Sequence, residues 1–440
     1  MKRVVEAGAD VNAHDKEGFT ALMLASEMGH LDITTLLIEK GADVDARNIM
    51  GVTALMIASQ SGKLEVTRYL ITAGADVNAK NDEGFTALIM ASQIGHSQIC
   101  SSLIENGADT NAKLTDGFTA LMLATEYGRL DVIKLLVEKD ADVNTKDRRG
   151  ATVLMIATEH GHAEVAQLFI NEGADVNART KKSNTILMVA SQFGHSEVAK
   201  LLIEAGADAN AKHTEGYTAL LIASEQGHPE VVQLLIEEGA NINAELNNGR
   251  PALMLASEKG HSNIVRLLIE AEANINAKDK LGRTVLITAL WEGYTEVASL
   301  LIEAGADVNP TATQGFTAIM ASSEKGQIEV VKLLIDKGAD VSTRNDHGNT
   351  SLMIATYHGQ IEIAKLLIEQ DADINAQNNL GATALMVVSV MGHADVVKLL
   401  IEEGADINLS NNNGYTALML ASEAGHTEIV QLLRDAGAKE

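Results

Sequence analysis

The sequence is poor in the residues that most often mark a redox site or a membrane segment. It has one cysteine, three prolines and one tryptophan in 440 residues, and aromatic residues make up only 3%. A single thiol cannot form a disulfide within the chain, which fits a reducing compartment or no redox demand. No run of 18 apolar residues is present, so we expect no membrane span. The opening MKRVVEAGADVN also lacks the apolar core of a signal peptide.

Positive charge is scarce as well. Lys and Arg number 34 against 60 Asp and Glu, which gives a formal net charge of −26. Because such a surface repels nucleic-acid phosphates and anionic lipid headgroups, we expect neither nucleic-acid binding nor membrane binding. The sequence shows no nucleophile paired with a base, no phosphate-binding glycine loop and no cysteine pair. We therefore expect no enzyme activity, no cofactor and no metal.

The sequence does contain one pattern that returns every 33 residues. The glycine at Gly18 recurs at this step, with Ser183 in the one gap, at Gly51, Gly84, Gly117, Gly150, Gly216, Gly249, Gly282, Gly315, Gly348, Gly381 and Gly414. Length alone favours about three domains, but an unbroken period predicts a stacked repeat array. We expect one array over residues 1–440 that starts with a partial repeat at 1–14. Repeats 1 to 13 then follow at 15–47, 48–80, 81–113, 114–146, 147–179, 180–212, 213–245, 246–278, 279–311, 312–344, 345–377, 378–410 and 411–440.

Each repeat predicts two short helices. In repeat 1, Thr20 is a helix N-cap signal before an apolar helix over residues 21–27, which Gly29 ends. A second helix over about residues 31–39 has the three- and four-residue spacing of one buried face, and Gly41 ends it. Because one such repeat cannot bury its apolar face alone, the pattern predicts an all-α solenoid in which neighbours stack.

The repeated residues resemble a known family. The pattern Gly-x-Thr-Ala-Leu-Met-Leu-Ala-Ser-x-x-Gly-His, followed by Leu-Leu-Ile-Glu-x-Gly-Ala-Asp-Val-Asn, resembles the ankyrin repeat over the whole of residues 1–440. The resemblance implies stacked helix-turn-helix units with hairpin-like tips. The family's usual Thr-Pro-Leu-His lacks its proline here, and Met replaces the histidine in ten repeats, as at Met23. We predict a buried methionine seam, with an oxidation-sensing stripe as the alternative.

The two ends of the pattern differ. Residues 4–10 read as the end of a second helix whose first helix is missing, so the start is either a truncation or a surface covered by something else. In the last repeat, Arg434 stands where the twelve earlier repeats carry Ile or Val. A charge at this position predicts a polar capping end.

Eight histidines follow the mid-repeat glycine, for example His96 and His195. A row of histidines suggests metal binding, but packed helix layers lie about 8–10 Å apart whereas zinc–nitrogen bonds are about 2.0–2.1 Å. We therefore predict a structural role at the start of the second helix.

The aromatic residues gather at three positions. Ten of the thirteen lie one, nine or ten residues after the turn glycine, positions that the resemblance places on the concave binding side. Six are in the turn, where a structural role and a contact role are equally favoured: Phe19, Phe85, Phe118, Tyr217, Phe316 and Tyr415. Four are at the end of the first helix, where a contact role is favoured: Tyr127, Phe193, Trp291 and Tyr357.

The position nine residues after the turn glycine makes the prediction of a binding surface more specific. It holds Glu in seven repeats and Gln in three, and the exceptions are Trp291, Tyr357 and Val390. Three further apolar residues, Leu281, Leu380 and Met391, lie close by in the pattern. An acidic channel interrupted by an apolar, aromatic patch predicts docking of a basic or amphipathic segment of a partner protein. The alternative is drift at a weakly constrained surface.

A second candidate site is basic. Arg148 and Arg149 lie on one turn tip, and Lys181 and Lys182 lie on the next. They form either solvated tips or one edge that binds an acidic partner or a phosphopeptide.

Together these features predict a non-catalytic scaffold for protein–protein interaction that binds its partner on the concave surface. We expect a monomer in the cytoplasm, or in the host cytosol if the protein is a secreted effector. One alternative is a regulatory or targeting arm of a larger enzyme or secreted effector whose catalytic part is absent from this chain. Another is a structural spacer or a designed repeat scaffold.

Overall fold

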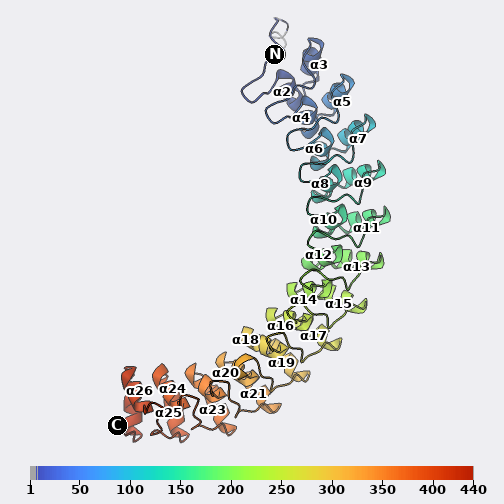
Figure 1. Cartoon of the computed structure of the whole chain (residues 1–440). Coiled ribbons are helices and arrows are strands. Elements are labelled where there is room, and N and C mark those ends of the chain that lie inside the picture. The colour runs from blue at the N-terminus through green and yellow to red at the C-terminus, as the bar shows by residue number, and fades with distance from the viewer. Residues whose placement is uncertain (1–5, 7, 440) are drawn as a thin grey trace. The chain divides into compact units, whose positions relative to one another are not determined.

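The computed structural model describes residue 6 and residues 8–439. Contacts divide the chain into two compact units, the N-terminal unit (residues 1–214) and the C-terminal unit (residues 215–440). Within each unit, helix pairs follow one another in the order of the repeats (Figure 1). The described residues form 26 α-helices and no named strand, so the predicted all-α repeat solenoid is confirmed. Most of the half repeat predicted over residues 4–10 lies outside the described residues.

Each repeat of the N-terminal unit contributes two helices. The first helices are α2 (Ala21–Met28), α4 (Ala54–Gln60), α6 (Ala87–Ile94), α8 (Ala120–Glu126), α10 (Val153–Glu159) and α12 (Ile186–Phe193). The second helices are α3 (Leu31–Glu39), α5 (Leu64–Thr72), α7 (Ser97–Glu105), α9 (Leu130–Glu138), α11 (Ala163–Asn171) and α13 (Ser196–Glu204).

The C-terminal unit repeats this arrangement. Its first helices are α14 (Ala219–Gln226), α16 (Ala252–Lys259), α18 (Val285–Glu292), α20 (Ala318–Glu324), α22 (Ser351–Tyr357), α24 (Ala384–Met391) and α26 (Ala417–Glu423). Its second helices are α15 (Pro229–Glu237), α17 (Ser262–Glu270), α19 (Thr295–Glu303), α21 (Ile328–Asp336), α23 (Ile361–Glu369), α25 (Ala394–Glu402) and α27 (Thr427–Asp435). A short 3-10 turn, η1 (Thr313–Gly315), forms the tip before α20.

The helices begin and end where the sequence predicts. The hydroxyl of Thr20 accepts a hydrogen bond from the backbone N–H of Met23 at 3.3 Å, as an N-cap should. Gly29 ends α2 in the left-handed region at φ 78°. After α3, Gly41 has φ 87° and its N–H donates to Ile38 O, while the next N–H donates to Leu37 O, which together close a Schellman turn.

Three repeats lack the glycine after the second helix. Asp140, Glu272 and Asp371 nevertheless adopt φ values of 57°, 61° and 61° at this position. Each residue therefore accepts the left-handed conformation that glycine takes elsewhere, at a cost in backbone strain.

First helices pack on first helices and second helices on second helices, and the core runs between them. The predicted methionine seam is confirmed, because Met23 and its equivalents are buried at 3% exposure or less, except Met419 at 40% in the last repeat. Cys100 on α7 is also fully buried in this core. Burial raises the pKa of its thiol to about 11, and a weak hydrogen bond from Ser92 acts in the opposite direction.

Polar groups on the turns also join one repeat to the next. Asn78 accepts a hydrogen bond from Asp109 N at 2.8 Å and donates to Gly107 O at 2.9 Å. On the other side of the stack, His96 Nε2 lies 3.2 Å from Gln60 O of the preceding repeat, and His195 contacts Glu159 O in the same way at 3.1 Å. The row of histidines thus has the structural role that the sequence predicts.

Candidate functional site

Two rows of side chains in the C-terminal unit make up the predicted docking surface. The turn row holds the residue after each turn glycine: Tyr217, Arg250, Arg283, Phe316, Asn349, Ala382 and Tyr415. The helix-end row holds the residue nine after that glycine, near the end of each first helix: Glu225, Glu258, Trp291, Glu324, Tyr357, Val390 and Glu423.

Aromatic rings connect the two rows. The Trp291 ring, near the end of α18, lies 6.0 Å from the ring of Phe316 with the planes tilted by 41°. Both residues are half-buried, so each presents one face to solvent. Tyr357 at the end of α22 is 47% exposed and meets His358 edge-on at 5.0 Å. The fixed ring pairs provide large apolar contacts that need little ordering on binding.

A hollow of about 310 Å³ lies beside Phe316 and Tyr357 and is lined by residues of repeats 10, 11 and 12. It is lined by the apolar residues Met353, Ile354 and Val387, the aromatic residues Phe316 and Tyr357, and the polar residues Glu324, Asn345, Asn349, His358 and Asn378. Both the turn row and the helix-end row therefore contribute to one concave place on the surface.

Hydrogen bonds join several of the polar groups that line this hollow. Asn378 Nδ2 donates to Asn349 Oδ1 at 2.8 Å, and Asn345 Oδ1 accepts from Asn349 N at 3.0 Å. Glu324 is half-buried and makes no ion pair with any described residue. A partly desolvated, unneutralised carboxylate favours a cationic partner.

Four residues of the two rows lie at the hollow: Phe316, Glu324, Asn349 and Tyr357. Three repeats earlier the equivalent residues are Tyr217, Glu225, Arg250 and Glu258. There the Arg250 side chain is only 16% exposed and forms an ion pair with Glu258, whose side chain is 26% exposed. Burial lowers the pKa of Arg250, and the positive charge of Arg283 lowers it further. Arg250 Nε and Nη2 are both buried and neither donates a hydrogen bond to the described residues, so the contact with Glu258 is an ion pair without a hydrogen bond.

Two neighbours complete the environment of Arg250. Burial raises the pKa of the Tyr217 phenol, and the charge of Glu225, to which it is hydrogen-bonded, raises it further. Asp279 holds Arg283 through a two-pronged contact, with Oδ2 at 2.7 Å from both Nε and Nη2. This part of the surface is a charge cluster whose members pair with one another: Arg250 with Glu258, Arg283 with Asp279 and Tyr217 with Glu225.

The structure brings together some of the predicted docking residues. Trp291 contacts Phe316, and Phe316 and Tyr357 line the same hollow. Leu281 and Leu380 lie on turn tips, 65% and 72% exposed, and do not line it. Val390 and Met391, at the end of α24, are 42% and 37% exposed and lie outside it as well.

Phe316, Glu324 and Asn349 are site residues that the sequence-based selection left out. Phe316 was grouped with the turn aromatics, for which a structural role was equally favoured, and Glu324 with the acidic channel. Their positions in the repeat could have identified them, because Glu324 lies in the same row as Tyr357 and Asn349 lies in the same row as Phe316.

The predicted residues of the N-terminal unit are also exposed. Tyr127 follows the end of α8 and is 48% exposed, and Phe193 at the end of α12 is 47% exposed. The Phe193 ring stacks on His195, with centroids 6.1 Å apart. Phe193 is thereby held in place while it offers its other face to solvent.

The basic residues do share one edge. Lys181 N donates to Arg149 O at 2.9 Å, which joins the two turn tips. The side chains of Arg148, Lys181 and Lys182 are exposed, whereas the Arg149 guanidinium lies 3.1 Å from the buried carboxylate of Asp147. Three cations of this edge are therefore available to a partner without breaking an ion pair.

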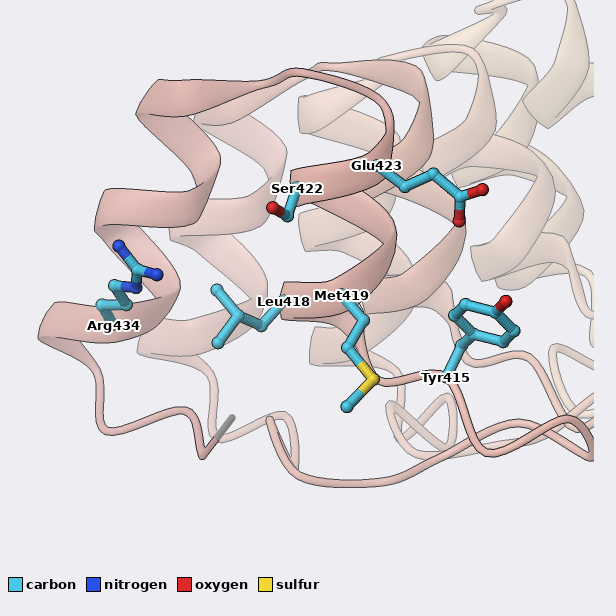
Figure 2. A pocket seen from close by; sticks show the side chains of 6 residues that line it. All are labelled: Tyr415, Leu418, Met419, Ser422, Glu423 and Arg434. Carbon is cyan, nitrogen blue, oxygen red and sulfur yellow. The ribbon is translucent and has the colours of Figure 1, made fainter.

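A larger hollow of about 520 Å³ lies on the last repeat. Figure 2 shows its lining, with Arg434 on α27 facing Leu418, Met419 and Ser422 on α26, and with Tyr415 and Glu423 beside them. Arg434 is exposed, as predicted for this position. In earlier repeats the equivalent methionine is covered by the next first helix. This hollow thus combines the last members of the two rows, Tyr415 and Glu423, with a face that contacts the next repeat elsewhere in the stack.

Residue 6 and residues 8–439 contain neither a metal-ligand cluster nor a membrane-spanning helix. No group of three His, Cys, Asp or Glu side chains in this part could hold a metal ion. Within the same residues, every helix is too short or too polar to cross a bilayer.

Comparison with known families matches almost the whole chain. A family described as "Ankyrin repeats (3 copies)" matches residues 1–81, 74–147, 145–213, 220–312, 307–378 and 370–440. A second, described as "Ankyrin repeats (many copies)", matches residues 197–236. None of the curated proteins compared with the chain matches it. Because the matched segments agree with the two-helix repeats of the structure, the chain belongs to the ankyrin-repeat family.

Proposed function

We propose that this protein is a non-catalytic scaffold that holds a basic or amphipathic segment of a partner protein across the turn row and helix-end row of repeats 9–12. Ankyrin repeats are in general protein–protein interaction modules. The observation that carries the specific proposal is the cluster of Trp291, Phe316 and Tyr357, in which Trp291 and Tyr357 interrupt the acidic helix-end row.

The chemistry of the patch suits such a partner. Trp and Tyr are frequent energetic anchors of interfaces, because a rigid ring buries much area at little entropic cost. Glu324 lies beside the rings, and the chain as a whole has a formal net charge of −26. The rings would provide affinity, and the acidic surroundings would favour cationic segments and speed their approach.

The remaining predicted residues would extend the patch on two sides. Leu281 and Leu380 offer exposed apolar side chains on the turn tips, and Val390 and Met391 offer them at the end of α24. An amphipathic segment needs such scattered apolar contacts in addition to its charges.

The N-terminal unit supplies a second set of proposed contacts. Tyr127 and Phe193 would meet apolar side chains of a partner, and the edge formed by Arg148, Arg149, Lys181 and Lys182 would meet acidic ones. A monomeric state and a location in the cytoplasm or host cytosol stay predictions.

The proposal is tested by selecting peptides from a displayed random library on the intact protein and measuring their affinity for variants. The double variant Trp291→Ala, Tyr357→Ala should weaken the selected peptides at least about tenfold, since anchor truncations commonly cost 2 kcal/mol or more. Met28→Ala, Ile49→Ala is the matched control, because these apolar side chains, 65% and 69% exposed, lie in the other unit and belong to none of the proposed contacts.

Equal affinity for the protein and for the Trp291/Tyr357 variant, with both folded by circular dichroism, would show that the patch is not the docking site. Selected peptides without an excess of Lys and Arg would contradict the predicted chemistry of the partner.

A further inference from the structure

We propose that the hollow lined by repeats 10 to 12 is a receptor for one arginine side chain of the partner. The inference rests on the proposed function and deepens it, because it names the group that the patch recognises. Two observations support it. The Glu324 carboxylate and the rings of Phe316 and Tyr357 line the hollow, and the equivalent place three repeats earlier holds the guanidinium of Arg250.

This equivalent place, the earlier copy of the hollow, lies in the same unit. Tyr217, Glu225, Arg250 and Glu258 occupy there the positions that Phe316, Glu324, Asn349 and Tyr357 occupy at the hollow. In the earlier copy the guanidinium of Arg250 fills the space, 16% exposed and paired with Glu258. The negative charge of Glu225 also acts on Arg250. The fold therefore accommodates a guanidinium between the two rows.

At the hollow the internal guanidinium is missing but its surroundings remain. The shorter Asn349 replaces Arg250 and accepts a hydrogen bond from Asn378, and a hollow of about 310 Å³ is open beside these two residues. Glu324 keeps the carboxylate that Glu225 supplies in the earlier copy, and no described cation neutralises it. Tyr357 replaces the second carboxylate with an aromatic face.

These differences favour a guest guanidinium over a guest ammonium. A planar guanidinium can donate two parallel hydrogen bonds to a carboxylate such as that of Glu324. It can also stack on the rings of Phe316 and Tyr357, which an ammonium does less well. The methylene groups of the arginine would lie on the apolar side chains of Met353 and Ile354.

The chain carries its own reporter for this site. Trp291 is the only tryptophan, and its ring lies 6.0 Å from that of Phe316, which lines the hollow. The intrinsic fluorescence of the full chain can therefore be titrated with the blocked tripeptide acetyl-Gly-Arg-Gly-amide. The matched probes replace arginine with citrulline, which is neutral and nearly isosteric, and with lysine.

We expect a saturable change with the arginine peptide, a weaker one with the lysine peptide and none with the citrulline peptide. Glu324→Gln should weaken the arginine peptide by about tenfold or more, the factor that follows from losing a hydrogen bond between charged groups. Glu126→Gln is the control, because Glu126 holds the same position in the repeat and is also half-buried but lies in the N-terminal unit.

A second variant fills the hollow instead of removing its charge. Asn349→Arg restores at this place the residue type found at Arg250, so it should abolish binding of the arginine peptide without unfolding the chain. If the citrulline peptide binds as well as the arginine peptide, or if neither Glu324→Gln nor Asn349→Arg affects binding, the receptor does not exist.

The failure of this inference and the failure of the docking proposal are distinguishable. Library-selected peptides that depend on Trp291 and Tyr357 but tolerate Glu324→Gln and Asn349→Arg would overturn the arginine receptor and leave the docking patch intact. Selected peptides that ignore all four substitutions would overturn both.

Discussion

The imidazole of His96 covers the α-carbon of Gly62 in the preceding repeat: a Cβ placed on Gly62 would lie 2.8 Å from His96 Cε1. The same ring reaches past the glycine to the carbonyl oxygen of Gln60, 3.2 Å from its Nε2. Gly62 has φ 72°, which glycine adopts without strain. One glycine thus provides both the turn between two helices and the flat surface on which the next repeat rests.

This relationship predicts an order of stability among glycine variants. Gly74 also has positive φ, 92°, but a Cβ there would meet no atom within 4 Å, so Gly74→Ala measures backbone strain alone, about 1–2 kcal/mol. Gly62→Ala should cost clearly more, since its Cβ would also collide with His96. Urea denaturation followed by circular dichroism gives the comparison.

Adding His96→Ala to Gly62→Ala should recover part of the loss, whereas adding it to Gly74→Ala should cause a further loss. If Gly62→Ala and Gly74→Ala lower the free energy of unfolding equally, the His96 ring moves to make room for the new Cβ and does not hold the repeats together.

The hydrogen bonds between turns predict a stabilising substitution. Asn78 accepts from the backbone of Asp109 and donates to Gly107 O, whereas Asp45, at the same position one repeat earlier, only accepts, from Asp76 N at 2.9 Å. Asp45→Asn should add a donor bond to Gly74 O and stabilise the N-terminal unit by about 0.5–1.5 kcal/mol. The reverse change, Asn78→Asp, should destabilise it by a similar amount.

Amide hydrogen exchange at Asp76 and Asp109 is the appropriate measurement, because neighbouring repeats open locally and not as one body. Slower exchange for Asp45→Asn together with faster exchange for Asn78→Asp is the expected pair of results. If exchange becomes slower in both variants, or faster in both, the hydrogen bond donated by the asparagine side chain does not stabilise the contact between repeats.

The fold was predictable because its determinants are local and repeated. Thr20 and its equivalents cap the first helices, and Gly29 and Gly41 end the helices by backbone geometry that few other residues accept. The methionine seam was also predictable, since an apolar side chain at a core position has one favourable place to go. A single sequence therefore shows where a helix needs a cap or a left-handed residue, and where a side chain must be apolar.

The occupancy of the candidate site could not be predicted in this way. Arg250 and Asn349 hold the same position, yet Arg250 pairs with Glu258 whereas Asn349 accepts a hydrogen bond from Asn378 and lines an open hollow. The adjacent helix-end position also differs, with Glu258 in one case and Tyr357 in the other, and Asn378 belongs to a neighbouring repeat. The sequence also left open whether Asp140 would accept a left-handed conformation, which it does at φ 57°.

Cys100 predicts a fall of stability at alkaline pH. Burial raises its pKa in the folded chain from 9.0 to about 11, so the folded state holds the thiol proton more tightly than the unfolded state does. The resulting stability is present below pH 9 and is lost as the pH rises from about 9 to 11. Cys100→Ala, with the residue found at Ala166 and Ala199, should remove this part of the pH dependence.

The same burial should protect the thiol from reagents, since the thiolate is the reactive form. Alkylation by iodoacetamide at pH 8 should be slow in the native protein and fast in urea. Native labelling as rapid as that of the unfolded chain would contradict the buried position of Cys100.

The charge cluster at Arg250 gives the last prediction. Arg250→Ala removes a half-buried guanidinium and leaves the carboxylates of Glu225 and Glu258 facing an emptied space beside Tyr217. The loss should destabilise this part of the C-terminal unit by about 1–3 kcal/mol, because partly buried carboxylates are left without the cation that faces them. Hydrogen exchange in repeats 7 and 8 would register it.

The space left by Arg250→Ala should then bind a small guanidinium compound. Methylguanidinium at low millimolar concentration should restore part of the protection in Arg250→Ala, and methylammonium at the same concentration should restore less, since only the guanidinium reproduces the planar contacts. Arg283→Ala is the matched control. It removes a neighbouring cation held by Asp279 on the exposed side of the cluster, 30% exposed, and leaves Arg250 in place, so neither cation should protect it. Equal rescue by both cations would reduce the cluster to a centre of negative charge, and no rescue would mean that the space closes when Arg250 is removed.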